Sequence, residues 1–247
     1  MKAKSLRIGT SGWNYNHWRE RFYPPDIAKS KWLEYYSDHF DTIEVNATFY
    51  RLPKPKTFEN WYERTPENFN WAVKASKYIT HTKRLKEAGE PLERFYQSVQ
   101  ILKEKTGPIL FQLPPSFTFE RERFQAFCKD LRPGYRHALE FRHASWIDES
   151  VFKILKENNI ALCISDTAGR YPYCEALTAD FLYMRLHGSR KLYASEYTEA
   201  ELQVWAKKIR EWNRDTYIYF DNDQDAHAVK NAERLKQILA SPPVTAN

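Results

Sequence analysis

The stretch Ala138-Leu139-Glu140-Phe141-Arg142-His143 alternates apolar and polar side chains with a period of two, which predicts a β-strand. On this strand Glu140 and Arg142 share one face, whereas Leu139 and Phe141 share the other. A charged inner row and an apolar outer row fit a closed barrel, because the apolar row can pack on helices while the polar row points into the barrel near its mouth. The rest of the chain can be compared with that prediction.

Seven further stretches show similar alternation or a short apolar run bounded by turn residues. They lie at residues 6–13, 42–49, 70–76, 109–113, 160–165, 181–187 and 216–220, and the opening strand extends over 136–143. Amphipathic helical patterns separate nearly all of them. Alternation of strands and helices predicts parallel strands joined by right-handed crossovers.

The length of the chain favours a closed barrel over an open sheet. Eight strand–helix units in 247 residues are typical of a single α/β protein with a (β/α)8 barrel, the TIM-type fold. Residues 167–179 are short and irregular, which predicts a reduced or missing sixth helix. We find no short-period repeat, low-complexity run or linker, so we expect one TIM-barrel domain over residues 1–247.

Composition narrows the functional classes. The three cysteines are too few and too scattered for a disulfide framework, which indicates a reducing, cytoplasmic setting. The N-terminus lacks the apolar run of a signal peptide, and no stretch approaches the roughly 18 apolar residues of a membrane span, so we expect no membrane attachment. A net charge of +6 weakly favours an anionic partner.

Polar side chains recur where the predicted strands end, and in barrels of this type the active site lies at those C-terminal ends. They are Glu44, Asn46, Thr48, Lys74, Gln112, Glu140, Arg142, Asp166, Arg185, His187 and either Asp221 or Asn222. One interpretation is a set of internal ion pairs that only fills space. Burial of so many charges costs several kcal/mol per ion unless each is paired, which favours a functional site.

Three of these residues are candidates to bind an anion, since ammonium and guanidinium groups suit carboxylate or phosphate. They are Lys74, Arg142 and Arg185. We predict acid/base catalysis by Glu140 and His187, because the side chain of His187 points inward and its ordinary pKa is near neutrality. The other predicted substrate-binding residues are Glu44, Asn46, Gln112, Asp166 and Asn222, with Trp13 and Tyr15 from the aromatic loop 13–28. That loop is either a plug or a lid that contacts substrate.

Other chemistries remain open at these positions. Glu44 and Glu140 fit the carboxylate pair of glycoside hydrolysis. Together with Asp166 and His187 they are also chemically suitable metal ligands. However, three nearby cations would repel a divalent ion, and no HxxxH or CxxC spacing supports a metal. We therefore predict no metal and no cofactor.

Seven groups of motifs together resemble the YecE-like family, also called domain of unknown function 72, over nearly the whole chain. They are Ile8-Gly9-Thr10-Ser11-Gly12-Trp13 followed by Phe22-Tyr23-Pro24, Glu44-Val45-Asn46-Ala47-Thr48-Phe49-Tyr50, Trp71-Ala72-Val73-Lys74 with Thr80-His81, Gln112-Leu113-Pro114-Pro115, Glu140-Phe141-Arg142-His143 with Ser145-Trp146, Arg185-Leu186-His187-Gly188 and Tyr219-Phe220-Asp221-Asn222. The resemblance implies a TIM-type barrel and no established reaction. Asp221 departs from the family pattern, in which we expect Asn.

The leading hypothesis is a metal-independent enzyme, of the hydrolase, lyase or isomerase class, that acts on a small phosphate- or carboxylate-bearing substrate at the C-terminal barrel mouth. A second hypothesis is a nucleic-acid enzyme or binder, because basic loop residues are interleaved with aromatic side chains that can stack on bases. Those basic residues are Arg19, Arg21, Lys77, Lys83, Arg84, Arg190 and Lys191. A third is a non-catalytic ligand-binding barrel. The sequence predicts no oligomeric state.

Overall fold

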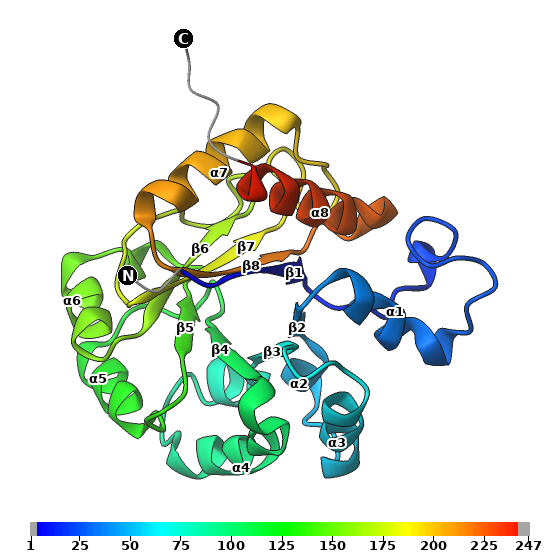
Figure 1. Ribbon diagram of the computed structural model, residues 1–247. Coiled ribbons are helices and arrows are strands. Elements are labelled where there is room, and N and C mark those ends of the chain that lie inside the picture. Colours follow the sequence, from blue (N-terminus) through cyan, green and yellow to red (C-terminus); the bar gives the residue numbers. More distant parts are fainter. Residues whose placement is uncertain (1–3, 242–247) are drawn as a thin grey trace.

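The eight predicted strands all form and pair in parallel in the computed structural model, which describes residues 4–241 (Figure 1). They are β1 (Leu6–Thr10), β2 (Thr42–Val45), β3 (Asn70–Lys74), β4 (Thr106–Gln112), β5 (His137–Glu140), β6 (Ala161–Asp166), β7 (Phe181–Leu186) and β8 (Asp215–Phe220). Each strand pairs with its neighbours in chain order, and β8 pairs with β1. Between β1 and β2 only a bridge of Ser11 with Glu44 remains, where the Gly12 amide donates to the Glu44 carbonyl at 2.9 Å. The result is the predicted α/β barrel, nearly closed.

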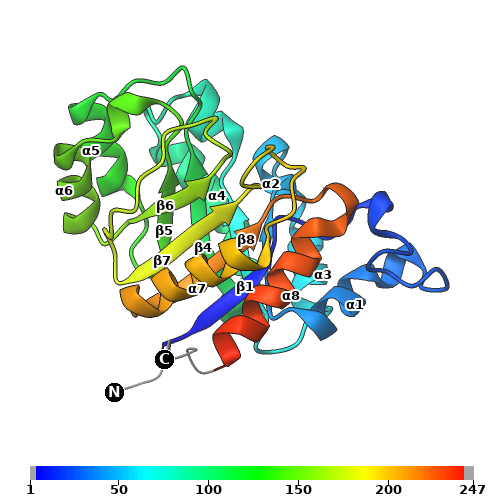
Figure 2. The ribbon, with the colours of Figure 1, turned by 90° about the horizontal axis from the view of Figure 1, so that it is seen from above.

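Helices surround the barrel and connect its strands. They are α1 (Trp32–His39), α2 (Ala47–Tyr50), α3 (Pro55–Glu63), α4 (Gly89–Val99), α5 (Arg121–Asp130), α6 (Glu149–Glu157), α7 (Glu199–Trp212) and α8 (His227–Ala240). Short helical turns are η1 (Asn16–Trp18), η2 (Lys29–Lys31), η3 (Tyr78–Thr82), η4 (Gln100–Lys105), η5 (Ala144–Trp146) and η6 (Gln224–Ala226). Figures 1 and 2 show α7 and α8 covering β7, β8 and β1. Residues 167–180, all of them described, contain no helix, which confirms that the helix expected after the sixth strand is missing.

Several strands end earlier than the sequence predicts, and two of these early ends, those of β2 and β5, shape the barrel rim. The prediction of a strand over residues 42–49 is wrong beyond Val45, because the chain then turns into α2. The Thr48 hydroxyl fixes that turn by donating to the carbonyl of Lys74 at 2.6 Å. The opening stretch is a strand only as far as Glu140, so Arg142 extends from the loop that follows β5. Both early ends place polar side chains on the barrel rim.

Aromatic side chains fill the barrel below its mouth. Phe181 and Tyr183 on β7 and Tyr217 and Tyr219 on β8 point inward, where they meet small residues of other strands such as Ala72 on β3. Large residues on one side and small ones on the other fill the interior at the density expected of a protein core. This packed layer is the floor on which the polar residues at the C-terminal ends of the strands rest.

The aromatic loop 13–28 lies at the C-terminal end of the barrel, beside the mouth. The indole nitrogen of Trp18 donates to the carbonyl of Asp223, which follows β8, at 2.9 Å. Tyr23 stacks on Trp32 of α1, with ring centroids 4.4 Å apart. Figure 1 shows this segment extending sideways with α1 rather than across the strands. The loop is therefore fastened to the flank of the mouth.

No helix in the described part of the chain is long and apolar enough to cross a lipid bilayer.

Candidate functional site

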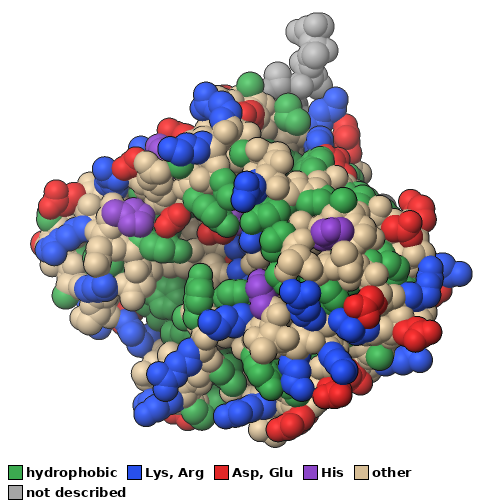
Figure 3. All heavy atoms as spheres, turned by 180° about the vertical axis from the view of Figure 1, so that it is seen from behind, with side chains coloured by type: hydrophobic (Ala, Val, Ile, Leu, Met, Phe, Trp, Pro, Cys, Tyr) green, Lys and Arg blue, Asp and Glu red, His purple; other side chains and the backbone are tan. Residues whose placement is uncertain are grey.

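The C-terminal ends of the strands carry a cluster of buried or partly buried polar side chains, most of them charged, which we call the mouth cluster. Its members are Ser11, Glu44, Lys74, Glu140, Arg142, Arg185, His187 and Asp221. They come from the ends of six strands and the loops that follow them. Figure 3 looks onto this end and shows a hollow bordered by hydrophobic and basic side chains. Fold and cluster together define the place where barrels of this type carry their active sites.

Arg185 is the centre of the mouth cluster, and its side chain is only 1% exposed. Its guanidinium donates to Glu44 Oε1 at 2.8 Å, to Glu140 Oε2 at 2.8 Å and to Asp221 Oδ2 at 2.9 Å. Burial opposes the charge, but the three carboxylates outweigh burial and raise the pKa of Arg185 well above its usual range. Because its donors are already engaged, Arg185 holds the cluster together rather than offering a free contact to a substrate.

Glu44 forms the bottom of the cluster and is completely buried. Tyr183 donates from its hydroxyl to Glu44 Oε2 at 2.6 Å, and the Ser11 hydroxyl donates to Oε1. Arg185 also donates from Nε to Oε2 at 3.0 Å. Both carboxylate oxygens are thus satisfied, as a buried charge requires. Glu44 is a structural anion in this arrangement.

Glu140 and Arg142, two residues apart, form the next layer outward. Arg142 Nε donates to Glu140 Oε1 at 2.8 Å, and the Arg142 guanidinium lies 4.4 Å from the ring centroid of Tyr171. Burial raises the pKa of Glu140, but Arg142 and then Arg185 outweigh it and hold the pKa well below its usual range. Glu140 is therefore ionised near neutral pH and is a weak base. The side chain of Arg142 is 12% exposed, so it reaches the surface of the mouth.

His187 is paired with Asp221 and shielded from solvent. Its Nδ1 lies 2.9 Å from Asp221 Oδ2, in an orientation too bent for a well-aligned hydrogen bond. Its Nε2 lies 3.3 Å from Arg185, and the ring of Tyr193 packs edge-on against it. The pKa of Asp221 is lowered because Arg185 and His187 outweigh its burial. His187 is therefore fully buried, with Tyr193 among the side chains that cover it.

Lys74 ends β3 and is the remaining cation of the mouth cluster. Its side chain is buried, and Nζ lies 4.4 Å from the ring centroid of Phe49. Burial, followed by the charge of Arg185, lowers the pKa of Lys74 to about 8, although Glu140 and the other carboxylates oppose this shift. Burial and the charges of Lys74 and Arg142 lower the pKa of the neighbouring His81 to about 4. A neutral imidazole therefore lies near Lys74 at neutral pH.

Three predicted substrate-binding residues lie outside the mouth cluster. Asp166 shares the parity of Leu186 rather than Arg185, so it points outward and accepts from Tyr197 at 2.8 Å. Asn222 follows Asp221 with opposite parity and donates to Asn231 at 2.9 Å. The ring of Trp13 packs on Trp61 and Trp71, between β3 and α3. Strand parity explains the first two, because a shift of one residue moves a side chain to the other face.

The other predicted residues lie at or beside the cluster. Asn46 donates to Ser11 Oγ at 3.2 Å, and its own Oδ1 is buried without a hydrogen-bond partner. Gln112 is buried on β4 beside Glu140, its register partner. Tyr15 donates to the Ser11 carbonyl at 2.6 Å.

Sequence reasoning missed some of the residues that complete the site. Ser11 could have been found from parity, because it follows the inward-facing Gly9 by two residues. Asp221 was named only as an alternative to Asn222, which was predicted to bind substrate, and its parity with Tyr219 shows that Asp221 is the residue that faces the cluster. Tyr171 and Tyr193 lie in irregular loops, where no periodic signal exists.

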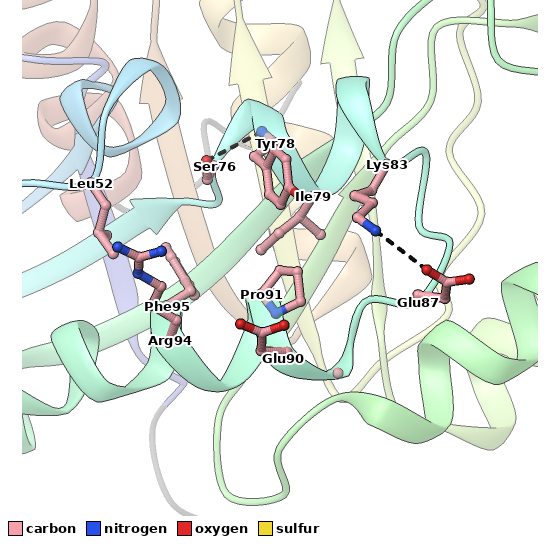
Figure 4. Close-up of a pocket in the computed structure, with 11 residues that line it drawn as sticks. Leu52, Ser76, Tyr78, Ile79, Lys83, Glu87, Glu90, Pro91, Arg94 and Phe95 are labelled. Carbon is pink, nitrogen blue, oxygen red and sulfur yellow. Dashed lines mark hydrogen bonds and ion pairs between the residues drawn. The ribbon is translucent and has the colours of Figure 1, made fainter.

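One well-formed cavity lies outside the mouth cluster. It measures about 570 Å³ and is lined by η3 and the start of α4, including Tyr78, Lys83 and Arg94 (Figure 4). Its charged side chains lie at the surface, and the visible ion pair joins Lys83 to Glu87. We place the candidate site at the mouth cluster instead, because buried charges there are costly to maintain without a function.

Within residues 4–241, no three His, Cys, Asp or Glu side chains come together in a way that could hold a metal ion. The carboxylates proposed as metal ligands from the sequence lie with Arg185 instead, apart from Asp166, which points outward.

The fold and the mouth cluster define a (β/α)8-barrel protein with a polar site at the C-terminal end of its strands. Residues 7–246 match the family described as "Protein of unknown function DUF72", and this chain belongs to that family. The family resemblance of the sequence motifs is thereby confirmed.

Relatives in two bacteria cover nearly the same length. The chain is 27% identical over 269 residues to UPF0759 protein YunF of Bacillus subtilis (strain 168), and the match covers 95% of this chain and 94% of YunF. It is 25% identical over 250 residues to UPF0759 protein YecE of Escherichia coli (strain K12), which covers 87% of this chain and 90% of YecE. The crystal structure of a DUF72 family protein from Thermotoga maritima superposes with a TM-score of 0.86 at 30% identity, over 96% of this chain and 100% of that protein.

Proposed function

We propose that this barrel is an enzyme that binds a small phosphate- or carboxylate-bearing substrate at its mouth through Arg142 and Lys74. One observation supports this proposal above the others. Among the side-chain contacts of residues 4–241, Lys74 Nζ and the two terminal nitrogens of Arg142 have no hydrogen-bond or ion-pair partner, whereas the donors of Arg185 are engaged. A buried ammonium group and a partly exposed guanidinium in a low-dielectric mouth attract an anion strongly.

The mouth also provides a rigid support for that contact. Tyr171 stacks under the guanidinium of Arg142, and Glu140 holds its Nε. A guanidinium fixed on two sides loses less conformational entropy when it binds a ligand. The substrate is therefore expected to lie over the outer edge of Arg142, at the same mouth as Lys74, whose strand β3 is separated from β5 only by β4.

Acid/base catalysis needs a group whose pKa is near the working pH. Glu140 is less suited to act as the base than the sequence predicts, because its pKa is held low and both oxygens accept hydrogen bonds from arginines. His187 remains a candidate once Tyr193 moves aside. The proposal assigns the chemistry to side chains and requires no resident metal.

The test is binding of inorganic phosphate and malonate, measured by isothermal titration calorimetry. Arg142→Ala is expected to weaken binding about 10-fold or more, since a hydrogen bond to a charged group contributes about 1.5–3 kcal/mol. Arg84→Ala is the matched control, because Arg84 also lies over an aromatic ring, that of Phe117, and bonds only to Ser116. Circular dichroism checks the fold. Binding unchanged in Arg142→Ala, or absent from the unmodified protein, contradicts the proposal.

The nucleic-acid alternative has weaker support. Of the basic loop residues, Arg21 pairs with Asp225 and Arg84 donates to Ser116, so part of the expected basic surface is engaged within the chain. Binding of DNA or RNA with a steep salt dependence would favour this alternative. A bound small anion that is never converted would instead favour the non-catalytic barrel.

A further inference from the structure

Lys74 differs from Lys105, the other lysine that is buried in the described residues. Lys105 is also buried, but its ammonium group donates to the carbonyls of Tyr62 and Thr65, both at 2.6 Å. In the described residues, Lys74 Nζ has no such acceptor and faces the ring of Phe49. A lysine amine that is desolvated and unpaired at the C-terminal end of a barrel strand has the environment of an activated nucleophile.

The charges around Lys74 come from every side of the mouth. Arg185 on β7 disfavours its protonated form, whereas Glu140 on β5, Glu44 on β2 and Asp221 after β8 favour it. On η3, His81 has a pKa lowered to about 4 and is neutral at pH 7. With the pKa of Lys74 at about 8, about a tenth of the amine is neutral at pH 7, roughly 300-fold more than for an ordinary lysine.

We propose that Lys74 is the nucleophile of the site and forms an imine with the carbonyl carbon of a 2-oxo acid whose carboxylate is bound by Arg142. This inference rests on the proposed function, because Arg142 must hold the anionic end of the substrate. The carboxylate and the carbonyl carbon of a 2-oxo acid are adjacent, which suits two cationic side chains that share one mouth.

The reaction needs no oxidant, reductant or metal. The lone pair of Nζ forms the C–N bond, and the π pair of the carbonyl moves to its oxygen. The two amine hydrogens leave with that oxygen as water when the C–O bond breaks, and one proton from solvent gives the protonated imine. The positive imine replaces the ammonium charge beside Glu140, Glu44 and Asp221, whose three negative charges exceed those of Arg142 and Arg185 by one. The carboxylates therefore stabilise it.

The experiment traps the imine in the intact protein. Glyoxylate, pyruvate and 2-oxoglutarate are each incubated with the protein and sodium cyanoborohydride at pH 7.5, and peptide mass spectrometry locates the reduced adducts. We expect at least one acid to modify Lys74 about 10-fold or more above the exposed Lys77, in keeping with its larger neutral fraction. Lys74→Arg should remove this adduct, while Lys77→Arg should leave it unchanged.

Two results separate this inference from the proposed function. If none of the three acids modifies Lys74 above the surface lysines, the imine is ruled out. The binding of phosphate and malonate without reductant, and its loss in Arg142→Ala, decide the proposed function independently. If the adduct on Lys74 persists in Arg142→Ala, Lys74 is still the nucleophile, but Arg142 does not orient the acid.

Discussion

At the scale of single residues, the unusual feature is the side chain of Lys74, whose positive charge is buried at a cost in free energy. Its folded-state pKa of about 8 lies below the ordinary value of 10.5, so folding must work against protonation. A folded pKa below the unfolded one means that the unfolded chain binds more protons between these two values. Lys74 therefore destabilises the protein at neutral pH, and this penalty disappears as the pH rises from about 8 to about 10.5.

Lys74→Met should stabilise the protein at pH 7 and lose that advantage at high pH. A pKa difference of about 2.5 units corresponds to about 3 kcal/mol, to within the order of magnitude. The measurement is urea unfolding of both proteins at several pH values from 7 to 10.5. The difference between the two free energies of unfolding should shrink over this range. If the difference in free energy of unfolding stays constant with pH, burial does not lower the pKa of Lys74.

At the scale of elements, the absence of a helix between β6 and β7 has a consequence for the mouth. The segment 167–180 stays irregular, and the Tyr171 amide donates to the Thr167 hydroxyl at 3.1 Å. This local bond holds Tyr171 beneath Arg142, where a helix packed on the outside of the barrel would have carried it away from the mouth. The exception to the repeated strand–helix pattern thus supplies part of the candidate site.

Tyr171→Ala should weaken anion binding about 2- to 5-fold, because an exposed cation–π contact contributes about 0.5–1 kcal/mol. Tyr171→Phe keeps the ring and should bind like the unmodified protein. Calorimetry with inorganic phosphate measures both variants. Equal losses of affinity in Tyr171→Ala and Tyr171→Phe would assign the effect to the hydroxyl group. Unchanged affinity in Tyr171→Ala would show that Tyr171 does not contribute to anion binding.

At the scale of the whole molecule, Arg185 connects strands from around the barrel. Its partners Glu44, Glu140 and Asp221 belong to β2, β5 and the end of β8, while Arg185 itself lies on β7. The bridge between Ser11 and Glu44 connects β1 to β2, the two strands that share no ladder. One buried guanidinium therefore joins segments separated by more than a hundred residues.

Arg185→Met should lower the free energy of unfolding by about 3–5 kcal/mol, because three buried carboxylates lose their shared cation. Chemical unfolding followed by circular dichroism measures this loss, with the exposed Arg190→Met as the control. We expect a single cooperative transition in all three proteins, as predicted for one domain over the chain. A loss below about 1 kcal/mol would mean that the carboxylates find other partners or become protonated.

The sequence by itself determined the barrel and most of its polar mouth. Alternation of strand and helix patterns was sufficient for the parallel topology, because each period reports which face of an element is buried. Within strands, the same parity correctly turned Glu44, Glu140 and Arg185 inward. The short and irregular segment 167–179 also predicted correctly that no helix precedes Phe181.

Only the tertiary structure decided how those residues divide their roles. The sequence did not show which residue faces inward at a strand end, so the prediction placed Asp166 inward and left Asp221 and Asn222 as alternatives, whereas the register of the paired strands decided both. Local sequence patterns also do not show which side chains of distant strands meet. These contacts pair Arg185 with carboxylates and leave Lys74 facing the ring of Phe49, without a partner among the described residues. Local periodicity fixes the direction of a side chain, whereas its charge state depends on neighbours that only the closed barrel brings together.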